Sequence, residues 1–141
     1  MLDLDPLLLI PLAFVLGLMA LPILSRRLHG SVEFIDPVAL HTEMESPSSP
    51  YVFDIRPEKE YDAGHIPGAA KLPASRLATM ITQKEKLVTD TKSEPVVLVC
   101  QSDLESIRMW KKLRSDGWEN IRVLKGGMYK WKRSHMPIEK T

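Results

Sequence analysis

The side chain best suited to chemistry is Cys100, the single cysteine of the 141-residue chain. It directly follows the apolar run of residues 96–99, whose composition is typical of a buried parallel strand. Ligand sites in open α/β sheets gather at the carboxyl ends of strands, because loops and helix N-termini converge there. A cysteine in that place is either a small buried hydrophobic residue or a nucleophile. In the second case, backbone amides and a helix dipole would stabilise its thiolate.

Residues 101–105 separate this strand from a helix predicted over residues 106–116. We expect the backbone amides of this segment to curl toward the Cys100 sulfur and to favour a negative charge there. Two residues of the segment, Asp103 and Glu105, are acidic. Carboxylates beside a thiol raise its pKa, and they repel dianionic substrates.

Three further polar residues each have two interpretations. In the functional interpretation, the positive charge of Arg56 would offset the negative charges of the acidic residues at the mouth of the site. In the structural interpretation, the Asp54 carboxylate would accept hydrogen bonds from neighbouring loop amides. His65 stands in a Gly-His-Ile-Pro-Gly turn, where its ring either bonds the backbone or transfers a proton. For these residues we favour the structural interpretation.

Alternating strand and helix patterns must position these groups. Strands are predicted over residues 32–35, 51–55, 69–72, 96–99 and 121–124. Helical segments are predicted over residues 37–44, 57–61, 76–86, 106–116 and 128–134, with a polar loop over residues 89–95. This order predicts an α/β domain with a mostly parallel central sheet flanked by helices, and we expect Trp110, Trp118 and Trp131 to pack in or beside its core.

The composition excludes several classes of protein. With 44% hydrophobic and 26% charged residues, the chain is neither disordered nor collagen-like. A single cysteine cannot form an intramolecular disulfide or a cysteine-pair zinc site, and the four histidines lack metal-ligand spacing. We therefore expect no metal and no cofactor. The net charge of +1, without a basic stripe interleaved with aromatic residues, argues against nucleic acid as a partner.

Residues 6–25 contain no ionisable side chain and predict a membrane anchor. A helix of that length spans roughly 30 Å, the hydrocarbon thickness of a bilayer. Pro11 and Pro22 are expected to bend or shorten it. The alternative is a cleaved signal peptide, but such a peptide starts with positive charge, and here Asp3 and Asp5 precede the apolar segment.

Arg26 and Arg27 directly follow the apolar segment, and no Lys or Arg precedes it. By the positive-inside rule, the N-terminus lies outside and the C-terminal part lies in the cytoplasm. We therefore predict a single-pass membrane protein with two parts. Residues 1–28 form a transmembrane anchor that contacts membrane lipid through residues 6–25, and residues 29–141 form a cytoplasmic domain.

Two groups of residues resemble the rhodanese-like (sulfurtransferase) domain family, and the resemblance covers about residues 32–140. The first group comprises residues 52–56 (Val-Phe-Asp-Ile-Arg), Glu60-Tyr61 and residues 64–69 (Gly-His-Ile-Pro-Gly-Ala). The second comprises residues 96–100 with the helix that follows, Gly117, residues 124–127 (Leu-Lys-Gly-Gly) and Trp131. The resemblance implies a rhodanese-like α/β fold, which one transmembrane helix would precede.

The resemblance also implies that Cys100 is a nucleophile that takes a sulfane sulfur as a persulfide and passes it to a thiol or protein acceptor. Backbone amides of the active loop would hold the anionic sulfur or the donor. The loop residues are Gln101, Ser102, Asp103, Leu104, Glu105 and Ser106, and Asp54 and Arg56 would support them. The sixth loop position, frequently Arg or a small hydroxyl residue in the family, is Glu105 here. A cationic or neutral persulfide, or a basic partner protein, therefore fits better than thiosulfate.

Two functions remain open. The chain is either a membrane-tethered sulfurtransferase, whose anchor keeps it close to a membrane-protein partner, or a non-catalytic rhodanese-like module that binds or regulates a partner through the loop around Glu105. A cysteine-based phosphatase is disfavoured, because its loop is longer and ends in an arginine that binds the phosphate dianion.

Overall fold

The computed structural model of the chain describes residues 14, 15, 17 and 30–141. The chain divides into two units, Met1–Ser31 and Val32–Thr141, and the second unit holds the sheet and the candidate site residues. Within the described residues, no helix has the length and apolar character needed to cross a membrane. The anchor predicted over residues 6–25 lies outside the described residues, except for Phe14, Val15 and Gly17. The anchor and the domain boundary after residue 28 therefore stay predictions.

A parallel five-stranded sheet forms the centre of the second unit. Its strands are β1 (Glu33–Ile35), β2 (Tyr51–Asp54), β3 (Ala70–Lys71), β4 (Val96–Val99) and β5 (Ile121–Leu124). They lie in the order β1-β5-β4-β2-β3, and each neighbouring pair is parallel. The central strand β4 is buried along its whole length, which explains the continuous apolar run before Cys100. The predicted α/β fold with a parallel sheet is confirmed.

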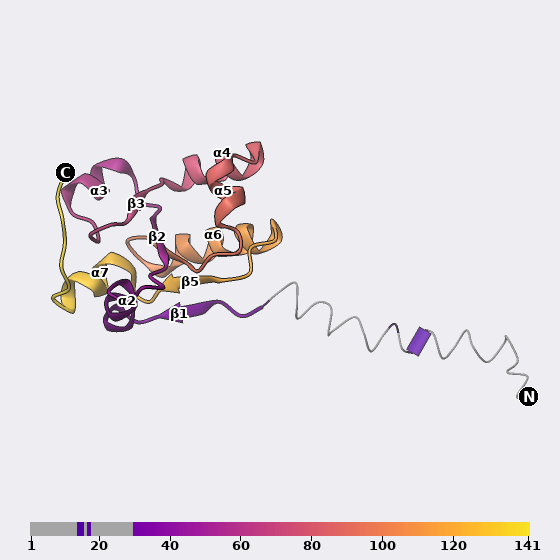
Figure 1. Cartoon of the computed structure of the whole chain (residues 1–141), viewed down its shortest axis with the longest axis horizontal. Coiled ribbons are helices and arrows are strands. Elements are labelled where there is room, and N and C mark those ends of the chain that lie inside the picture. The colour runs from indigo at the N-terminus through magenta and orange to yellow at the C-terminus, as the bar shows by residue number, and fades with distance from the viewer. Residues whose placement is uncertain (1–13, 16, 18–29) are drawn as a thin grey trace, which may run out of the picture. The chain divides into compact units, whose positions relative to one another are not determined.

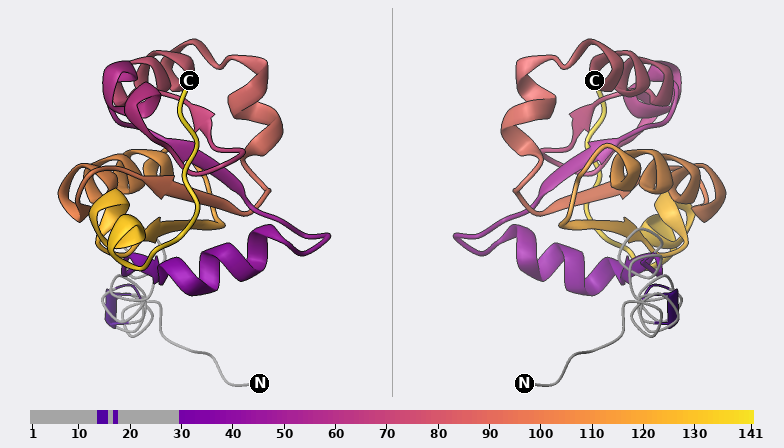
Figure 2. Two further views of the ribbon diagram at one scale, coloured as in Figure 1. Left: turned by 90° about the vertical axis from the view of Figure 1, so that its left-hand side faces the viewer. Right: turned by 90° about the vertical axis from the view of Figure 1, so that its right-hand side faces the viewer.

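Helices cover both faces of this sheet (Figures 1 and 2). They are α2 (Pro37–Met44), α3 (Glu58–Ala63), α4 (Ala74–Gln83), α5 (Lys86–Thr91), α6 (Asp103–Ser115) and α7 (Gly127–Arg133). One buried cluster joins α4, α5 and α6 to Val96 and Leu98 of β4. The other joins α2, α3 and α7 to Val97 and Val99 of the same strand. Because successive side chains of a strand point to opposite faces, β4 contributes to both hydrophobic cores.

Helix α5 differs from the prediction, because the sequence predicts a polar loop over residues 89–95. Val88 and Thr91 of this short helix are buried, and the Thr91 hydroxyl donates a hydrogen bond to the carbonyl oxygen of Leu87 (2.8 Å). Burial against the sheet therefore outweighs the weak helix propensity of these β-branched residues.

Helix α6 begins at Asp103, whereas the sequence predicts a start near Ser106. Ser102 has an extended backbone (φ −138°, ψ 178°) and occupies the N-cap position without a side-chain cap hydrogen bond, so the free loop after Cys100 is short. Asp103 and Glu105 consequently lie in the first helical turn, where the helix dipole favours acidic side chains.

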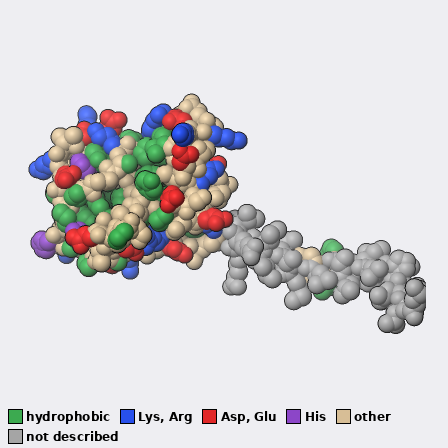
Figure 3. Space-filling model, in the orientation of Figure 1, with side chains coloured by type: hydrophobic (Ala, Val, Ile, Leu, Met, Phe, Trp, Pro, Cys, Tyr) green, Lys and Arg blue, Asp and Glu red, His purple; other side chains and the backbone are tan. Residues whose placement is uncertain are grey.

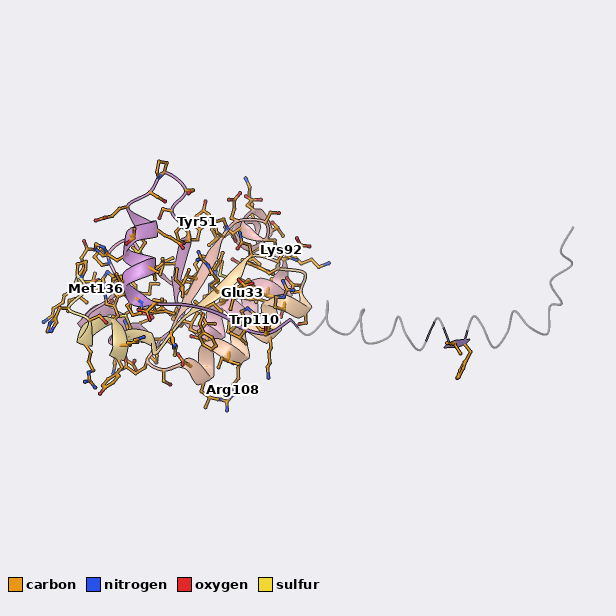
Figure 4. All side chains as sticks on the ribbon, turned by 90° about the horizontal axis from the view of Figure 1, so that it is seen from below. Glu33, Tyr51, Lys92, Arg108, Trp110 and Met136 are labelled. Carbon is orange, nitrogen blue, oxygen red and sulfur yellow. The ribbon has the colours of Figure 1, made fainter. Side chains whose placement is uncertain are left out.

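The two sides of α6 differ in burial, as its apolar spacing predicts. Trp110 is buried against the sheet, and its indole Nε1 donates a hydrogen bond to the carbonyl oxygen of Ile121 (3.0 Å). Arg108, in contrast, points away from the domain (Figure 4). Trp118 and Trp131 are also buried, so the expected packing of the three tryptophans is confirmed.

Candidate functional site

Cys100 lies at the carboxyl edge of the sheet, immediately after the central strand β4. The left-hand view of Figure 2 looks onto this side of the domain, where α3 and α7 lie on either side of the start of α6. The Cys100 side chain is 5% exposed, and its Sγ donates a hydrogen bond to Oε2 of Glu105 (3.4 Å). The Cys100 carbonyl oxygen accepts a hydrogen bond from the backbone N–H of Met128 (2.8 Å). Cys100 is therefore tied to α6 through its side chain and to α7 through its backbone.

The surroundings of Cys100 keep its thiol protonated at neutral pH. Burial raises the pKa of Cys100 to about 11, and the Glu105 carboxylate acts in the same direction. Hydrogen bonds from the backbone amides of Gln101 and Ser102 lower the pKa, but they do not offset burial. Two amides of the expected cradle thus act on the sulfur, and their effect favours a negative charge there.

The two acidic residues after Cys100 have different surroundings. Glu105 contacts the thiol, whereas Oδ1 of Asp103 accepts a hydrogen bond from the backbone N–H of Gly126 (2.7 Å). Contrary to the expectation that both carboxylates act on the thiol, Asp103 fastens the start of α6 to the turn before α7. Glu105 is the carboxylate that raises the Cys100 pKa.

The Gly126-Gly127 turn brings α7 against the backbone of Cys100. Gly127 has a positive φ of 55°, and a Cβ atom there would collide with the Cys100 carbonyl oxygen and lie 2.7 Å from that of Gln101. Only glycine permits this approach of two backbone segments. The second glycine of the Leu-Lys-Gly-Gly sequence therefore positions the site.

Asp54 and Arg56 form a buried ion pair beside the site. Nη2 of Arg56 lies 2.6 Å from Oδ2 of Asp54, and each side chain is almost fully buried. The Asp54 carboxylate also accepts a hydrogen bond from the backbone N–H of Arg56 (3.1 Å), while Nη2 of Arg56 donates to the carbonyl oxygen of Gly64 (2.9 Å). The pair ties the end of β2 to the turn after α3, which agrees with the structural interpretation.

His65 also makes structural contacts. Its ring stacks on Tyr61 with the ring centroids 3.7 Å apart, and Nδ1 donates a hydrogen bond to the Tyr61 carbonyl oxygen (2.9 Å). The backbone of His65 exchanges two hydrogen bonds with that of Glu139, each 2.9 Å long. The last residues of the chain therefore cross from α7 to α3 along this side of the domain (Figure 2, left).

An open cavity of about 340 Å³ lies beside the Cys100 loop. Its lining residues come from the end of β2, the first part of the loop, α3 and α7, and are Arg56, Glu60, Ala63, Gln101 and Lys132. This volume is at the lower end of the range for small-molecule sites. Glu60 and Lys132 could not be predicted as site residues, because no local pattern shows that α3 and α7 meet beside Gln101.

The pattern of the rhodanese-like domain matches residues 36–134, which cover all these site residues. The chain belongs to the rhodanese-like domain family. This assignment agrees with the fold and with the position of Cys100 after the central strand of the sheet.

Several proteins are similar to this rhodanese-like chain. The uncharacterized protein YqhL of Bacillus subtilis is 39% identical over 80 residues, which make up 57% of this chain and 59% of YqhL. The thiosulfate sulfurtransferase GlpE of Pseudoalteromonas translucida is 29% identical over 84 residues, or 60% of this chain and 74% of GlpE. The solved rhodanese-like domain of the Anabaena Alr3790 protein has a TM-score of 0.66 and 26% identity, and the match covers 79% of this chain and 81% of that domain. The chain thus spans less than two thirds of YqhL.

Proposed function

We propose that this chain is a membrane-anchored sulfurtransferase in which Cys100 accepts a sulfane sulfur as a persulfide and passes it to a thiol or protein acceptor. The observation that carries the proposal is the position of the thiol at the end of β4, with the backbone amides of Gln101 and Ser102 acting on its sulfur. Such amides stabilise the negative charge of a persulfide. The cavity beside Gln101 has room for a small donor, and the name of GlpE supports sulfur transfer.

The mass of the protein after incubation with cysteine persulfide tests this proposal. We expect a gain of about 32 Da, the mass of one sulfur atom, which a second incubation with a free thiol removes. The Cys100→Ser variant should gain no mass, since the chain has no other cysteine. A wild-type protein that stays unmodified with several persulfide donors would refute the enzymatic function.

We also propose that the anchor holds the rhodanese-like domain on the cytoplasmic side of a membrane. Support comes from the sequence, because residues 6–25 lack ionisable side chains and Arg26 and Arg27 follow them. An anchored domain meets acceptors at the membrane more often than a diffusing one, since tethering raises their effective concentration. A membrane-protein acceptor is therefore the partner that this architecture favours.

A non-catalytic binding module is the second candidate, and the raised pKa of Cys100 favours it, because a protonated thiol is a poor nucleophile. Leu104 and Tyr129, at the starts of α6 and α7, are exposed and offer apolar contacts to a partner. Hydrophobic side chains also gather over the middle of the face shown in Figure 3. The mass experiment separates the candidates, since a binding module gains no sulfur on Cys100.

A further inference from the structure

We propose that Glu105 is a catalytic residue, which removes the proton of the Cys100 thiol as the sulfur attacks its donor. The proposal rests on the proposed sulfurtransferase function and names the group that activates its nucleophile. The geometry points to it, because the thiol donates its hydrogen bond to Oε2 of Glu105 across 3.4 Å. The proton therefore already lies on the path from Sγ to the carboxylate.

The fold holds Glu105 in this position. Asp103 fastens the first turn of α6 to Gly126, and Ser106, the residue after Glu105, is 1% exposed. Among the described residues, Glu105 forms no ion pair with a lysine, arginine or histidine. Its carboxylate is thus free to accept a proton, and because the residue is exposed, it can exchange that proton with solvent.

The transfer step balances with Glu105 as base and then as acid. The thiol of Cys100 attacks the outer sulfur of a persulfide R–S–SH, and its proton passes to the Glu105 carboxylate. The new bond joins Sγ to the outer sulfur, while the S–S bond of the donor breaks and its electron pair stays on the leaving thiolate. Glu105 then returns the proton to that thiolate, which leaves as R–SH, and Cys100 carries the persulfide. Neither an oxidant nor a reductant is needed.

If Glu105 acted on Cys100 only through its negative charge, removing that charge would make sulfur transfer faster, not slower. Without the carboxylate, the Cys100 pKa falls, the thiolate becomes more abundant, and every reaction of the sulfur becomes faster. If Glu105 instead removes the proton during transfer, the loss of its charge slows transfer even though the thiolate is more abundant. The Glu105→Gln variant therefore separates the two effects.

The experiment compares two reactions of the full-length wild-type and Glu105→Gln chains at pH 7.5. The first is alkylation of Cys100 by iodoacetamide, which we expect to become about threefold faster or more in the variant, because its thiol ionises more easily. The second is sulfur transfer from cysteine persulfide, which we expect to become about 100-fold slower, the usual effect of losing a general base. Glu119→Gln, which removes an exposed carboxylate outside the cavity lining, is the matched control and should change neither rate.

Each remaining outcome counts against a different statement. If the wild-type chain transfers sulfur and Glu105→Gln does so equally fast or faster, Glu105 is not the base and the proposed function stands. If the wild-type chain takes up no sulfur while its Cys100 is still alkylated, the proposed function fails, and this inference fails with it.

Discussion

At the level of single residues, the protonation of one sulfur atom governs the reactivity of the site. Because burial raises the pKa of Cys100 to about 11, only half of its thiol is ionised at that pH, and the thiolate fraction should still be increasing there. A free cysteine, whose pKa is about 8.5, would instead reach its full reactivity near pH 9.5. We expect the rate of iodoacetamide alkylation to keep increasing between pH 9.5 and 11.

Rates measured on the native chain over this pH range check the prediction, and the same chain unfolded in urea serves as the control. In the unfolded chain the rate should level off at a pH about two units lower than in the native chain, since the surroundings that raise the pKa of Cys100 are lost. A native rate that is constant above pH 9.5 would show that the thiol ionises as in a free cysteine.

Among the connecting elements, the turn before α7 fixes the backbone of the loop after Cys100. Replacing Gly127 by alanine places a Cβ against the carbonyl oxygens of Cys100 and Gln101 and keeps a residue with positive φ. We expect a loss of about 3 kcal/mol or more in the free energy of unfolding, because steric overlap adds to backbone strain. Urea unfolding followed by tryptophan fluorescence measures this loss.

Gly117→Ala is the control for that substitution. Gly117 also has a positive φ, of 93°, but a Cβ there meets no atom within 4 Å. The free energy of unfolding of this variant should therefore fall only by the cost of backbone strain, about 1 kcal/mol. Equal losses in the two variants would mean that the steric overlap at Gly127 adds nothing to the backbone strain.

The sheet could be predicted from the sequence because its central strands carry a local signal. The run Val96–Val99 is apolar at each position, and burial on both faces requires this. The start of α6 could not be predicted so well. Aspartate is common in loops, and the hydrogen bond from Gly126 to Asp103 joins residues that are distant in sequence. For the same reason the sequence identifies Cys100 and its neighbours in the loop but not Lys132, which reaches the cavity from a helix distant in sequence.

For the whole molecule, we expect the rhodanese-like domain to lie in the cytoplasm. A green fluorescent protein fused after Thr141 should fluoresce in the membrane fraction, whereas alkaline phosphatase fused at the same place should be inactive. The reason is the pair Arg26 and Arg27, which by the positive-inside rule should retain the following domain on the inner side. Active phosphatase would reverse the orientation, and a fusion that stays in the soluble fraction would exclude the anchor. Exchanging both arginines for glutamate should weaken the preference of the C-terminal part for the cytoplasmic side.

The pairing of β1 with β5 has a consequence for how the domain folds. Glu33 lies opposite Arg122 in the register, so the first strand is held by the last one. During synthesis, β1 emerges long before β5, its neighbour in the sheet, exists. Pairings between such distant segments slow folding, because the entropy of closing the long loop is lost before the contacts form. The sheet can therefore be completed only after β5 has been made, and the late addition of β1 is a natural candidate for the slow step of folding.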